Sequence, residues 1–361
     1  MKTVHVDLGP RSYDIEIGSG NLAAAARFCD VDSEDAHAAI ITDENVDELY
    51  PAPVVEALEE QGVEVGVLVV EPGEPSKSPE VATELWERML DEGADRKTVV
   101  VALGGGVVGD LAGFVAATFG RGLRFVQIPT TLLAQVDSSV GGKVGINLPG
   151  AKNMIGAFWQ PRGVLIDVNV LQSLPDREYR AGLAEVVKYG VIQDANFFAY
   201  LEANVEPINA RDPGVLTHIV ERCCRLKADV VEKDEREETG LRAILNYGHT
   251  FCHAFEAATG YEALLHGEGV AIGMMCAARL AQRLGRVDAA FVERQRKLLE
   301  LLGLPLAVPD VAHDELIELM YHDKKVERGK LRFVLPSRMG HVELVRDVPT
   351  ADIVAALLET G

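Results

Sequence analysis

The first half of the chain alternates between apolar runs of strand length and segments with a helical period. Residues 1–18 alternate apolar and polar positions across a Gly-Pro break, which predicts a β-hairpin. Buried strands are predicted within residues 36–46, 63–78, 97–106 and 124–132, and helices within residues 50–61, 79–94 and 110–119. Strands that alternate with helices predict a parallel sheet with helices on both faces.

The pattern changes after about residue 173. From there, long segments carry apolar residues at the 3.6-residue spacing of amphipathic helices. A chain of 361 residues is also too long for one typical domain. We therefore expect an α/β domain over residues 1–172 and a mainly helical domain over residues 173–361, with the boundary near residues 169–178.

The formal net charge of −21 at pH 7 disfavours nucleic acid and anionic membrane surfaces as partners. An anionic substrate would need basic residues gathered around it against this field. No apolar run approaches the roughly 18 residues that a membrane span needs. The five cysteines are odd in number and form no CxxC pair, which indicates free thiols in a reducing compartment and predicts a cytoplasmic protein.

A glycine-rich segment from Gly104 to Gly109 matches GxGxxG after a predicted strand and before a predicted helix. Such a turn lets a pyrophosphate approach the N-terminus of the helix. The Rossmann fingerprint also needs an acid about 20 residues further on, and residues 124–132 contain none. Asp43, at the end of an earlier predicted strand, is a better candidate for the ribose. A tight turn without a ligand is the alternative.

Residues 137–158 contain six glycines or prolines, two lysines and little periodicity. A stretch of this length inside a compact domain predicts a functional loop. Lys143 and Lys152, set among backbone amides, would suit a phosphate. The alternative is a surface loop with incidental lysines.

Four residues of the second half are candidate metal ligands: Glu185, His249, His253 and His266. Three protein ligands with an open position form the arrangement of a catalytic zinc site. His249 and His253 lie four residues apart and could bind one ion from one helix face. Glu185 is a lone carboxylate among apolar residues, which favours either a metal or an ion pair with Lys188. The spacing alone does not decide which of the four is not a ligand.

Six segments occur in one order along nearly the whole chain: LGGGVVGDLAGFVAAT, IPTTLLAQVDSSVGGKVGIN, AKNMIGAF, AGLAEVVKYG, LNYGHTFCHAFE and HGEGVAIGM. Together they resemble the 3-dehydroquinate synthase family of sugar phosphate cyclases, whose fold is shared with glycerol dehydrogenases and iron-type alcohol dehydrogenases. The resemblance implies a lyase of the shikimate pathway that converts 3-deoxy-D-arabino-heptulosonate 7-phosphate to 3-dehydroquinate and phosphate. It implies transient oxidation by NAD, β-elimination, reduction and intramolecular aldol closure, with zinc or cobalt as the metal.

The resemblance also maps site residues onto this chain. It implies Glu185, His249 and His266 as metal ligands and leaves His253 near the substrate phosphate or in proton transfer. The residues that it places at the cofactor are Asp43, Asn45, Glu74, Lys77, Gly105, Gly106, Val107, Gly109, Asp110, Thr130, Thr131, Asp137, Ser138 and Ser173, together with Lys143 and Lys152. Those that it places around the substrate are Lys143, Lys152, Asn153, Asn246, His253, Lys324 and Lys325, with Lys227 and Arg242 for its carboxylate.

Arg121 matches a position that reaches into the neighbouring subunit's site, which implies a homodimer. Cys252 stands where the family commonly has glycine, and we expect its thiol to face away from the metal. Three alternatives remain: a polyol dehydrogenase that releases NADH, a sister cyclase that acts on sedoheptulose 7-phosphate, and a non-enzymatic NAD-binding protein that has kept the fold.

Overall fold

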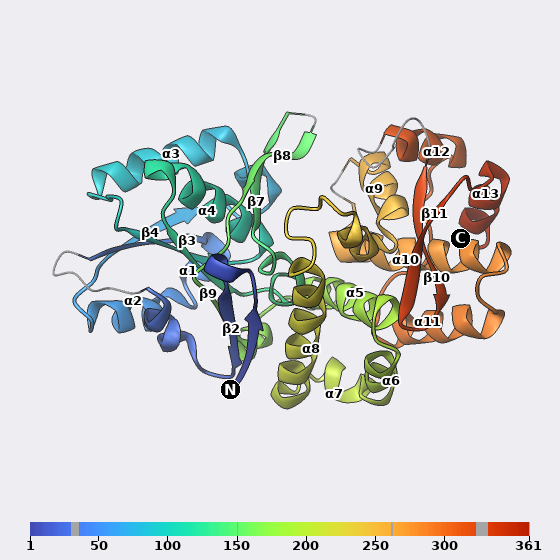
Figure 1. The fold of residues 1–361 in the computed structure, drawn as a ribbon, viewed down its shortest axis with the longest axis horizontal. Coiled ribbons are helices and arrows are strands. Elements are labelled where there is room, and N and C mark those ends of the chain that lie inside the picture. Colours follow the sequence, from blue (N-terminus) through green and yellow to red (C-terminus); the bar gives the residue numbers. More distant parts are fainter. Residues whose placement is uncertain (30–35, 150, 261–262, 323–330, 361) are drawn as a thin grey trace. The chain divides into compact units, whose positions relative to one another are not determined.

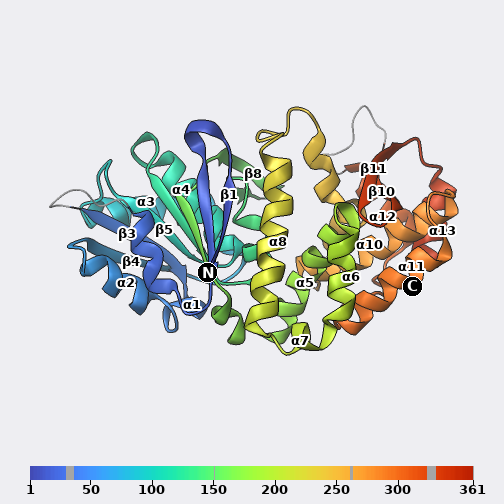
Figure 2. The same ribbon diagram turned by 60° about the horizontal axis from the view of Figure 1, so that its bottom comes forward.

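The computed structural model describes residues 1–29, 36–149, 151–260, 263–322 and 331–360. They fall into two compact units (Figures 1 and 2). The first unit consists of Met1–Leu174 and Leu216–Arg236, and the second of Pro175–Val215 and Glu237–Gly361. The sequence placed residues 216–236 with the second domain, whereas they pack with the first unit, so the division does not follow chain order.

The first unit is built on a seven-stranded sheet, which confirms the predicted α/β class. Its strand order is β1 (Lys2–Val6), β2 (Tyr13–Gly18), β9 (Gly163–Asp167), β6 (Arg124–Pro129), β5 (Val99–Gly104), β3 (His37–Asp43) and β4 (Glu64–Val70). The predicted hairpin of β1 and β2 is antiparallel, and every other neighbouring pair is parallel.

Helices cover both faces of this sheet because alternate strand residues point to opposite sides. Ala39 and Ile41 of β3 pack with α3 (Pro79–Asp91) and α4 (Gly106–Thr118). Ala38 and Ile40 pack on the other face with α2 (Pro51–Glu59) and the 3-10 helix η2 (Leu22–Phe28). Figure 1 shows α3 and α4 on one side of the strands and α2 on the other. The short helix α1 (Glu44–Asp47) follows β3 directly.

The strand order reverses direction between β3 and β5. From β3 the chain moves to β4 on one side, and it then returns to β5 on the other. Open parallel sheets bind ligands at the carboxyl ends of the strands that flank such a point. Here those ends are Asp43 and Gly104, so topology places both sequence candidates for nucleotide binding at the expected edge.

The expectation of a long loop over residues 137–158 is wrong. One helical turn, η5 (Ala134–Ser138), precedes an antiparallel hairpin of β7 (Lys143–Leu148) and β8 (Ala151–Phe158). Most of β8 is exposed, including Met154 and Ile155. Without a buried face there is no apolar alternation to reveal a strand.

The second unit is mainly helical, as predicted, with one hairpin that the sequence did not reveal. Its elements are α5 (Asp176–Ile192), α6 (Ala195–Ala203), α7 (Val205–Asn209), η7 (Leu241–Asn246), α9 (His249–Ala258), α10 (His266–Arg283), α11 (Ala289–Leu301), α12 (His313–His322), α13 (Thr350–Leu358), and the strands β10 (Arg332–Arg338) and β11 (His341–Arg346). Helix α10 packs against α5, α9, α11, α13 and β10, so it is the centre of this unit.

The remaining elements are α8 (Pro213–Val231), η1 (Gly9–Arg11), η3 (Glu74–Ser76), η4 (Phe119–Arg121) and η6 (Val168–Gln172). All five cysteines are buried, and none of them forms a disulfide bond. Within the described ranges, no helix combines the length and the apolar character that crossing a membrane requires.

Candidate functional site

The candidate metal site is assembled by close helix contacts in the second unit. A Cβ atom on Gly267 would lie 1.8 Å from the carbonyl oxygen of Ala181 in α5. Only glycine therefore permits this approach of α10 to α5. His266 precedes Gly267 at the start of α10, and Glu185 lies one helical turn after Ala181. The contact thus brings the imidazole of His266 beside the carboxylate of Glu185.

Helix α9 begins at His249 after a turn that also requires glycine. Gly248 has a φ of +83°, and a Cβ atom there would lie 2.8 Å from the backbone nitrogen of Met274 in α10. A side chain at this position would therefore be strained and would push α9 away from α10. The local sequence YGH positions His249 through this turn.

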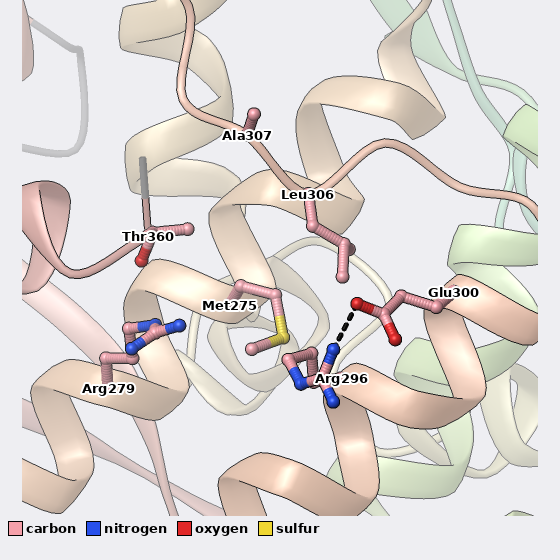
Figure 3. Close-up of a pocket in the computed structure, with 7 residues that line it drawn as sticks. All are labelled: Met275, Arg279, Arg296, Glu300, Leu306, Ala307 and Thr360. Atoms are coloured by element: carbon pink, nitrogen blue, oxygen red, sulfur yellow. Dashed lines mark hydrogen bonds and ion pairs between the residues drawn. The ribbon is translucent and has the colours of Figure 1, made fainter.

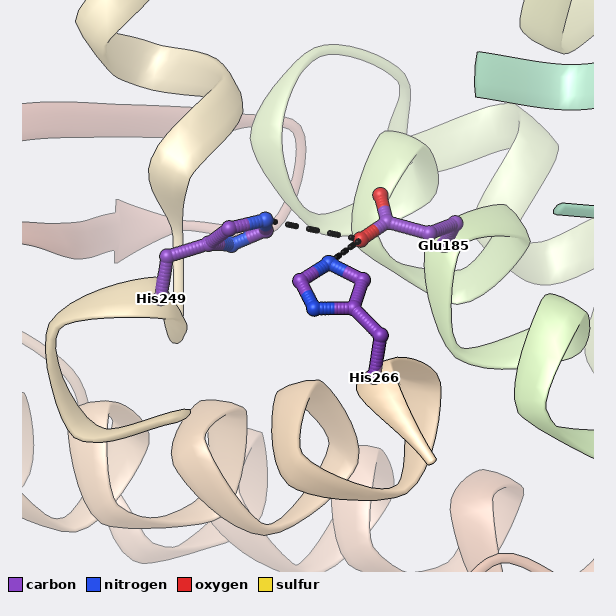
Figure 4. A group of neighbouring side chains, drawn as sticks. All are labelled: Glu185, His249 and His266. Atoms are coloured by element: carbon purple, nitrogen blue, oxygen red, sulfur yellow. Dashed lines mark ion pairs between the residues drawn. The ribbon is translucent and has the colours of Figure 1, made fainter. Parts of the chain in front are cut away.

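Hydrogen bonds orient both imidazoles in the same way. His249 Nδ1 lies 3.2 Å from the carbonyl oxygen of Tyr247, and His266 Nδ1 lies 3.0 Å from Glu256 Oε1. Both partners are acceptors, so each Nδ1 donates its proton, and Nε2 of a neutral ring then presents a lone pair. The two Nε2 atoms lie 3.6 Å and 3.8 Å from Glu185 Oε1 (Figure 4).

This arrangement fits a divalent cation. Glu185 Oε1 is buried and accepts no hydrogen bond from any described residue. Three electron-rich atoms converge at separations too long for hydrogen bonds, which is unfavourable in a buried site unless a cation lies between them. Ligands of a tetrahedral zinc ion are about 3.4 Å apart, close to the observed distances. Glu185, His249 and His266 could therefore hold the ion.

His253 lies beside this group but outside it. Its ring packs edge-on against that of His249 with centroids 5.7 Å apart. Considering only residues with described placement, His253 offers no atom to a set of potential metal ligands within 4.8 Å of one another. Two histidines one turn apart can therefore share a cavity wall without sharing an ion, and the candidate set uses His266 instead.

Cys252 contacts the Nδ1 edge of His266 and not the Nε2 edge that faces Glu185. Its Sγ lies 3.9 Å from Nδ1 and donates to the carbonyl oxygen of His266 at 3.6 Å. Burial raises the pKa of the Cys252 thiol, which favours the protonated form over the thiolate that binds metals.

Two buried residues next to the candidate metal ligands were absent from the set of site residues that the sequence indicated. Lys188 forms an ion pair with Glu185 Oε2, which leaves Oε1 to face the histidines. The carboxylate of Glu185 can therefore pair with Lys188 through one oxygen and bind a metal ion through the other. Glu256 had a single signal in the sequence: it is the only acid in α9.

The glycine-rich turn joins β5 to α4 as the sequence predicts. A Cβ atom on Gly105 would lie 3.1 Å from Thr131 Cγ2, and one on Gly106 would lie 3.1 Å from Ser138 Oγ. The first turn of α4, which holds Val107 and Gly109, thus lies beside residues assigned to the cofactor. Thr130 donates its backbone N–H to Gly104 at 2.9 Å. An anion could use the amides at this helix start.

Asp43 caps the next helix. Its Oδ1 accepts the backbone N–H groups of Asn45 and Val46 at 3.0 Å and 3.2 Å. Both bonds use one oxygen, so the second carboxylate oxygen can accept a hydroxyl group. The cap fixes the carboxylate at the strand end where topology predicts a ligand.

Lys77 links the cofactor candidates to the β7–β8 hairpin. Its buried Nζ lies 2.7 Å from Asp110 Oδ2, 2.6 Å from Asn153 Oδ1 and 3.5 Å from Glu74 Oε1. Burial lowers the pKa of Lys77, but the two carboxylates outweigh this effect and raise it above its ordinary value. Asn147 completes the network by donating to Glu74 and accepting the backbone N–H of Asn153.

The two residues expected at the substrate carboxylate lie in different units. Lys227 Nζ donates to the backbone oxygen and to Oδ1 of Asp137 at 2.7 Å and 2.8 Å. Arg242 is 3% exposed, and its Nε lies 3.6 Å from Glu237 Oε1. The side chain of Arg242 is therefore buried. Its acidic neighbour, Glu237, is nevertheless the kind of residue that an arginine on the surface would also contact.

The other predicted residues are distributed as follows. Lys143 is exposed at the start of β7, Lys152 is partly buried in β8, and Asn246 ends η7. Ser173 Oγ hydrogen-bonds to the hydroxyl of Tyr50. Lys324 and Lys325 lie outside the described residues.

A cavity of about 220 Å³ in the second unit is separate from these candidates. It is lined by Met275, Arg279, Arg296, Glu300, Leu306, Ala307 and Thr360. Figure 3 shows Arg296 paired with Glu300 at its edge. A second cavity, of about 430 Å³, lies in the first unit beside the carboxyl end of β4.

Two family models match consecutive parts of the chain. The model for the N-terminal part of 3-dehydroquinate synthase matches residues 67–181, and the model for its C-terminal part matches residues 182–326. A 3-dehydroquinate synthase of Desulforamulus reducens is 52% identical over 358 residues, 99% of each chain.

Two solved structures are similar over nearly the whole length. One is a 2-deoxy-scyllo-inosose synthase complexed with carbaglucose-6-phosphate, NAD⁺ and Co²⁺, with a TM-score of 0.89, 28% identity and 100% of each chain covered. The other is a 2-epi-5-epi-valiolone synthase of Streptomyces hygroscopicus with NAD⁺ and Zn²⁺ bound, with a TM-score of 0.88, 31% identity and 96% of each chain covered. The six sequence motifs, the fold and the two family matches agree, and the chain belongs to the 3-dehydroquinate synthase family.

Proposed function

We propose that the protein is a 3-dehydroquinate synthase, a lyase of the shikimate pathway that converts 3-deoxy-D-arabino-heptulosonate 7-phosphate to 3-dehydroquinate and phosphate. The observation that carries the proposal is the 52% identity to a 3-dehydroquinate synthase along the whole chain. A 2-deoxy-scyllo-inosose synthase and a 2-epi-5-epi-valiolone synthase are 28% and 31% identical over a comparable length. The choice among cyclases thus rests on sequence, since the fold is shared.

We further propose NAD and a divalent metal, zinc or cobalt, as cofactors. The two structural relatives were solved with NAD⁺ and with Co²⁺ or Zn²⁺, and the convergence of Glu185, His249 and His266 supports a cation here. When bound, NAD accepts and returns a hydride, and the metal lowers the pKa of a substrate hydroxyl group.

The residues of this chain then bind and orient one substrate through successive steps. Tyr247 and Glu256 hold the two imidazoles through Nδ1. The side-chain oxygen of Asn153 accepts a hydrogen bond from Lys77, so the side-chain nitrogen can donate to a phosphate. Arg242 supplies a buried guanidinium for the carboxylate of the substrate.

A cyclase and a polyol dehydrogenase differ in the fate of the hydride. Each NAD in the proposed reaction is reduced and reoxidised within one turnover, so a trace of NAD should support many equivalents of phosphate release. Absorbance of NADH should stay near zero throughout, because the reduced cofactor does not accumulate. An increase of NADH in step with substrate consumed would instead assign the protein to the dehydrogenases.

We also propose a homodimer in which Arg121 reaches the partner's site. Gly120, Arg121 and Gly122 all have positive φ, and Arg121 is exposed with a φ of +73°. Backbone in this region is unfavourable for arginine and is often retained at functional positions. Sedimentation equilibrium should give twice the chain mass. Mixed dimers of an Arg121→Ala chain and a His249→Ala chain should regain activity, and a monomer or a lack of complementation would contradict the proposal.

The cytoplasmic location remains a prediction, supported by five cysteines that form no disulfide bond. Recovery of the protein from an oxidising compartment in cell fractionation would contradict it.

A further inference from the structure

The two candidate metal-binding histidines differ in how firmly the protein holds them. The side chain of His249 is 11% exposed, and its Nδ1 donates to a backbone carbonyl that its own turn fixes. The side chain of His266 is 36% exposed, so packing holds its ring less tightly. Figure 4 shows the second ring nitrogen of His266 on the side away from Glu185. Whatever contacts that nitrogen decides how the ring is aimed.

Glu256 is the group that contacts it. Its carboxylate comes from the last turn of α9, its side chain is 10% exposed, and Oε1 lies 3.0 Å from His266 Nδ1. A buried carboxylate at this distance accepts the Nδ1 proton, and the ring then has its lone pair on Nε2, toward Glu185. The same bond raises the electron density of the imidazole and places a negative charge near a bound cation.

Resting on the metal dependence put forward under the proposed function, we propose that Glu256 is a positioning residue for the metal site. It selects the Nδ1–H form of His266, holds the ring orientation and strengthens the third metal ligand. In this role Glu256 acts through His266, whose Nδ1 it contacts, and not as a metal ligand itself.

Cys252 is the other group at this edge of the ring, but its geometry suits a different task. Its Sγ is 3.9 Å from Nδ1, well beyond the 3.0 Å of Glu256, and it donates to the backbone oxygen of His266. Gly269 faces it, where a Cβ atom would lie 2.8 Å from Sγ. The thiol therefore fills the contact between α9 and α10, whereas Glu256 makes the shorter contact with Nδ1 and favours the Nδ1–H tautomer.

The test measures metal affinity and not only turnover. Competition with a chelator gives the zinc dissociation constant of the full-length parent and of Glu256→Ala, Glu256→Gln and Cys252→Ala. Loss of a carboxylate behind a metal-binding histidine weakens affinity about 10- to 100-fold, and we expect this for Glu256→Ala. Glu256→Gln should lose less, because its amide oxygen can still accept the Nδ1 proton. Cys252→Ala should stay within about threefold, or roughly 0.6 kcal/mol.

Glu268→Gln provides the matched control. Glu268 lies two residues after His266, but its carboxylate binds Arg177 and the backbone N–H of Leu265. A general effect of negative charge would weaken metal binding equally in Glu268→Gln and Glu256→Gln, and that outcome would overturn the proposal. The visible spectrum of the cobalt-substituted protein should change for Glu256→Ala and not for Glu268→Gln, because only the first alters the ligand field.

Other outcomes also decide the matter. If Glu256→Ala binds zinc as the parent does but unfolds at a lower temperature without metal, Glu256 serves folding only and the proposal is wrong. Should the alanine variant not fold, the order of affinities of parent and Glu256→Gln carries the test, and equal affinities would overturn it. A parent that binds no zinc would refute the proposed metal dependence itself, which the parent measurement reveals before any variant is compared.

Discussion

Replacing His249 or His266 by alanine is expected to remove bound divalent metal and to lower kcat/KM by at least about a thousandfold. Each change deletes one of three converging candidate ligands and leaves Glu185 Oε1 buried with a single imidazole beside it. A bound cation can lower the pKa of a coordinated hydroxyl by several units, from 15.7 to about 7 for water, so its loss removes most of the driving force for deprotonation. The number of metal ions per chain, measured on the purified variants, tests the predicted loss of metal and needs no substrate.

His253→Ala is the matched control for these variants. His253 contacts the ring of His249 but belongs to no ligand group within the described ranges. We expect it to lose activity while it keeps about one metal ion per chain. Loss of the metal from His253→Ala, with retention in His266→Ala, would contradict the ligand set and would restore the pair spaced by four residues.

Changing Arg242 to alanine is expected to lower kcat/KM for the heptulosonate phosphate by at least about 30-fold. The guanidinium is buried, and the side chain of Glu237, its neighbour at 3.6 Å, is 42% exposed. Removing one partner of a desolvated charge pair costs roughly 2–5 kcal/mol, and about 1.4 kcal/mol corresponds to a factor of ten. The predicted range is therefore about 30- to 3,000-fold. Binding of NAD and of metal should stay near that of the parent.

Arg236→Ala controls for general loss of positive charge in this acidic chain. Arg236 is exposed and lies six residues before Arg242. Its removal should change kcat/KM by no more than about twofold, since exposed substitutions cost within about 0.5 kcal/mol. If kcat/KM of Arg242→Ala stays within about threefold of that of the parent, Arg242 does not bind the substrate carboxylate.

Several strands that helices cover on both faces were predictable from the sequence, whereas β10 was not recognised although Phe333, Val334 and Leu335 are buried. In β3, Ile40 and Ile41 are both fully buried because helices cover the two sheet faces, and a continuous apolar run is the result. β8 has no such face: Met154 and Ile155 are 49% and 40% exposed, and the hairpin was mistaken for a loop. The pattern of hydrophobic residues along a chain reflects which residues are buried. It therefore reveals a helix or strand only where one side of that element is buried and the other is not, or where the whole element is buried.

The candidate metal site shows a second limit. The spacing of four residues along α9 suggested that His249 and His253 bind one metal ion. The histidine that converges with His249 on Glu185 is instead His266, which is on another helix. His266 reaches Glu185 because Gly267 permits contact with the backbone of Ala181. That contact joins segments more than 80 residues apart, and nothing in local spacing predicts it. The family resemblance named the three residues whose side chains converge in the structure, because a resemblance along the whole chain carries such long-range information.

Product analysis tests the central claim most directly. The purified protein, loaded with zinc and given a trace of NAD, is incubated with 3-deoxy-D-arabino-heptulosonate 7-phosphate and, separately, with sedoheptulose 7-phosphate. The account predicts that the first substrate yields 3-dehydroquinate and phosphate in equal amounts, many times the amount of NAD, and that the second yields little of either. Preferential cyclisation of sedoheptulose 7-phosphate, or phosphate release without a carbocyclic product from the first substrate, would contradict it.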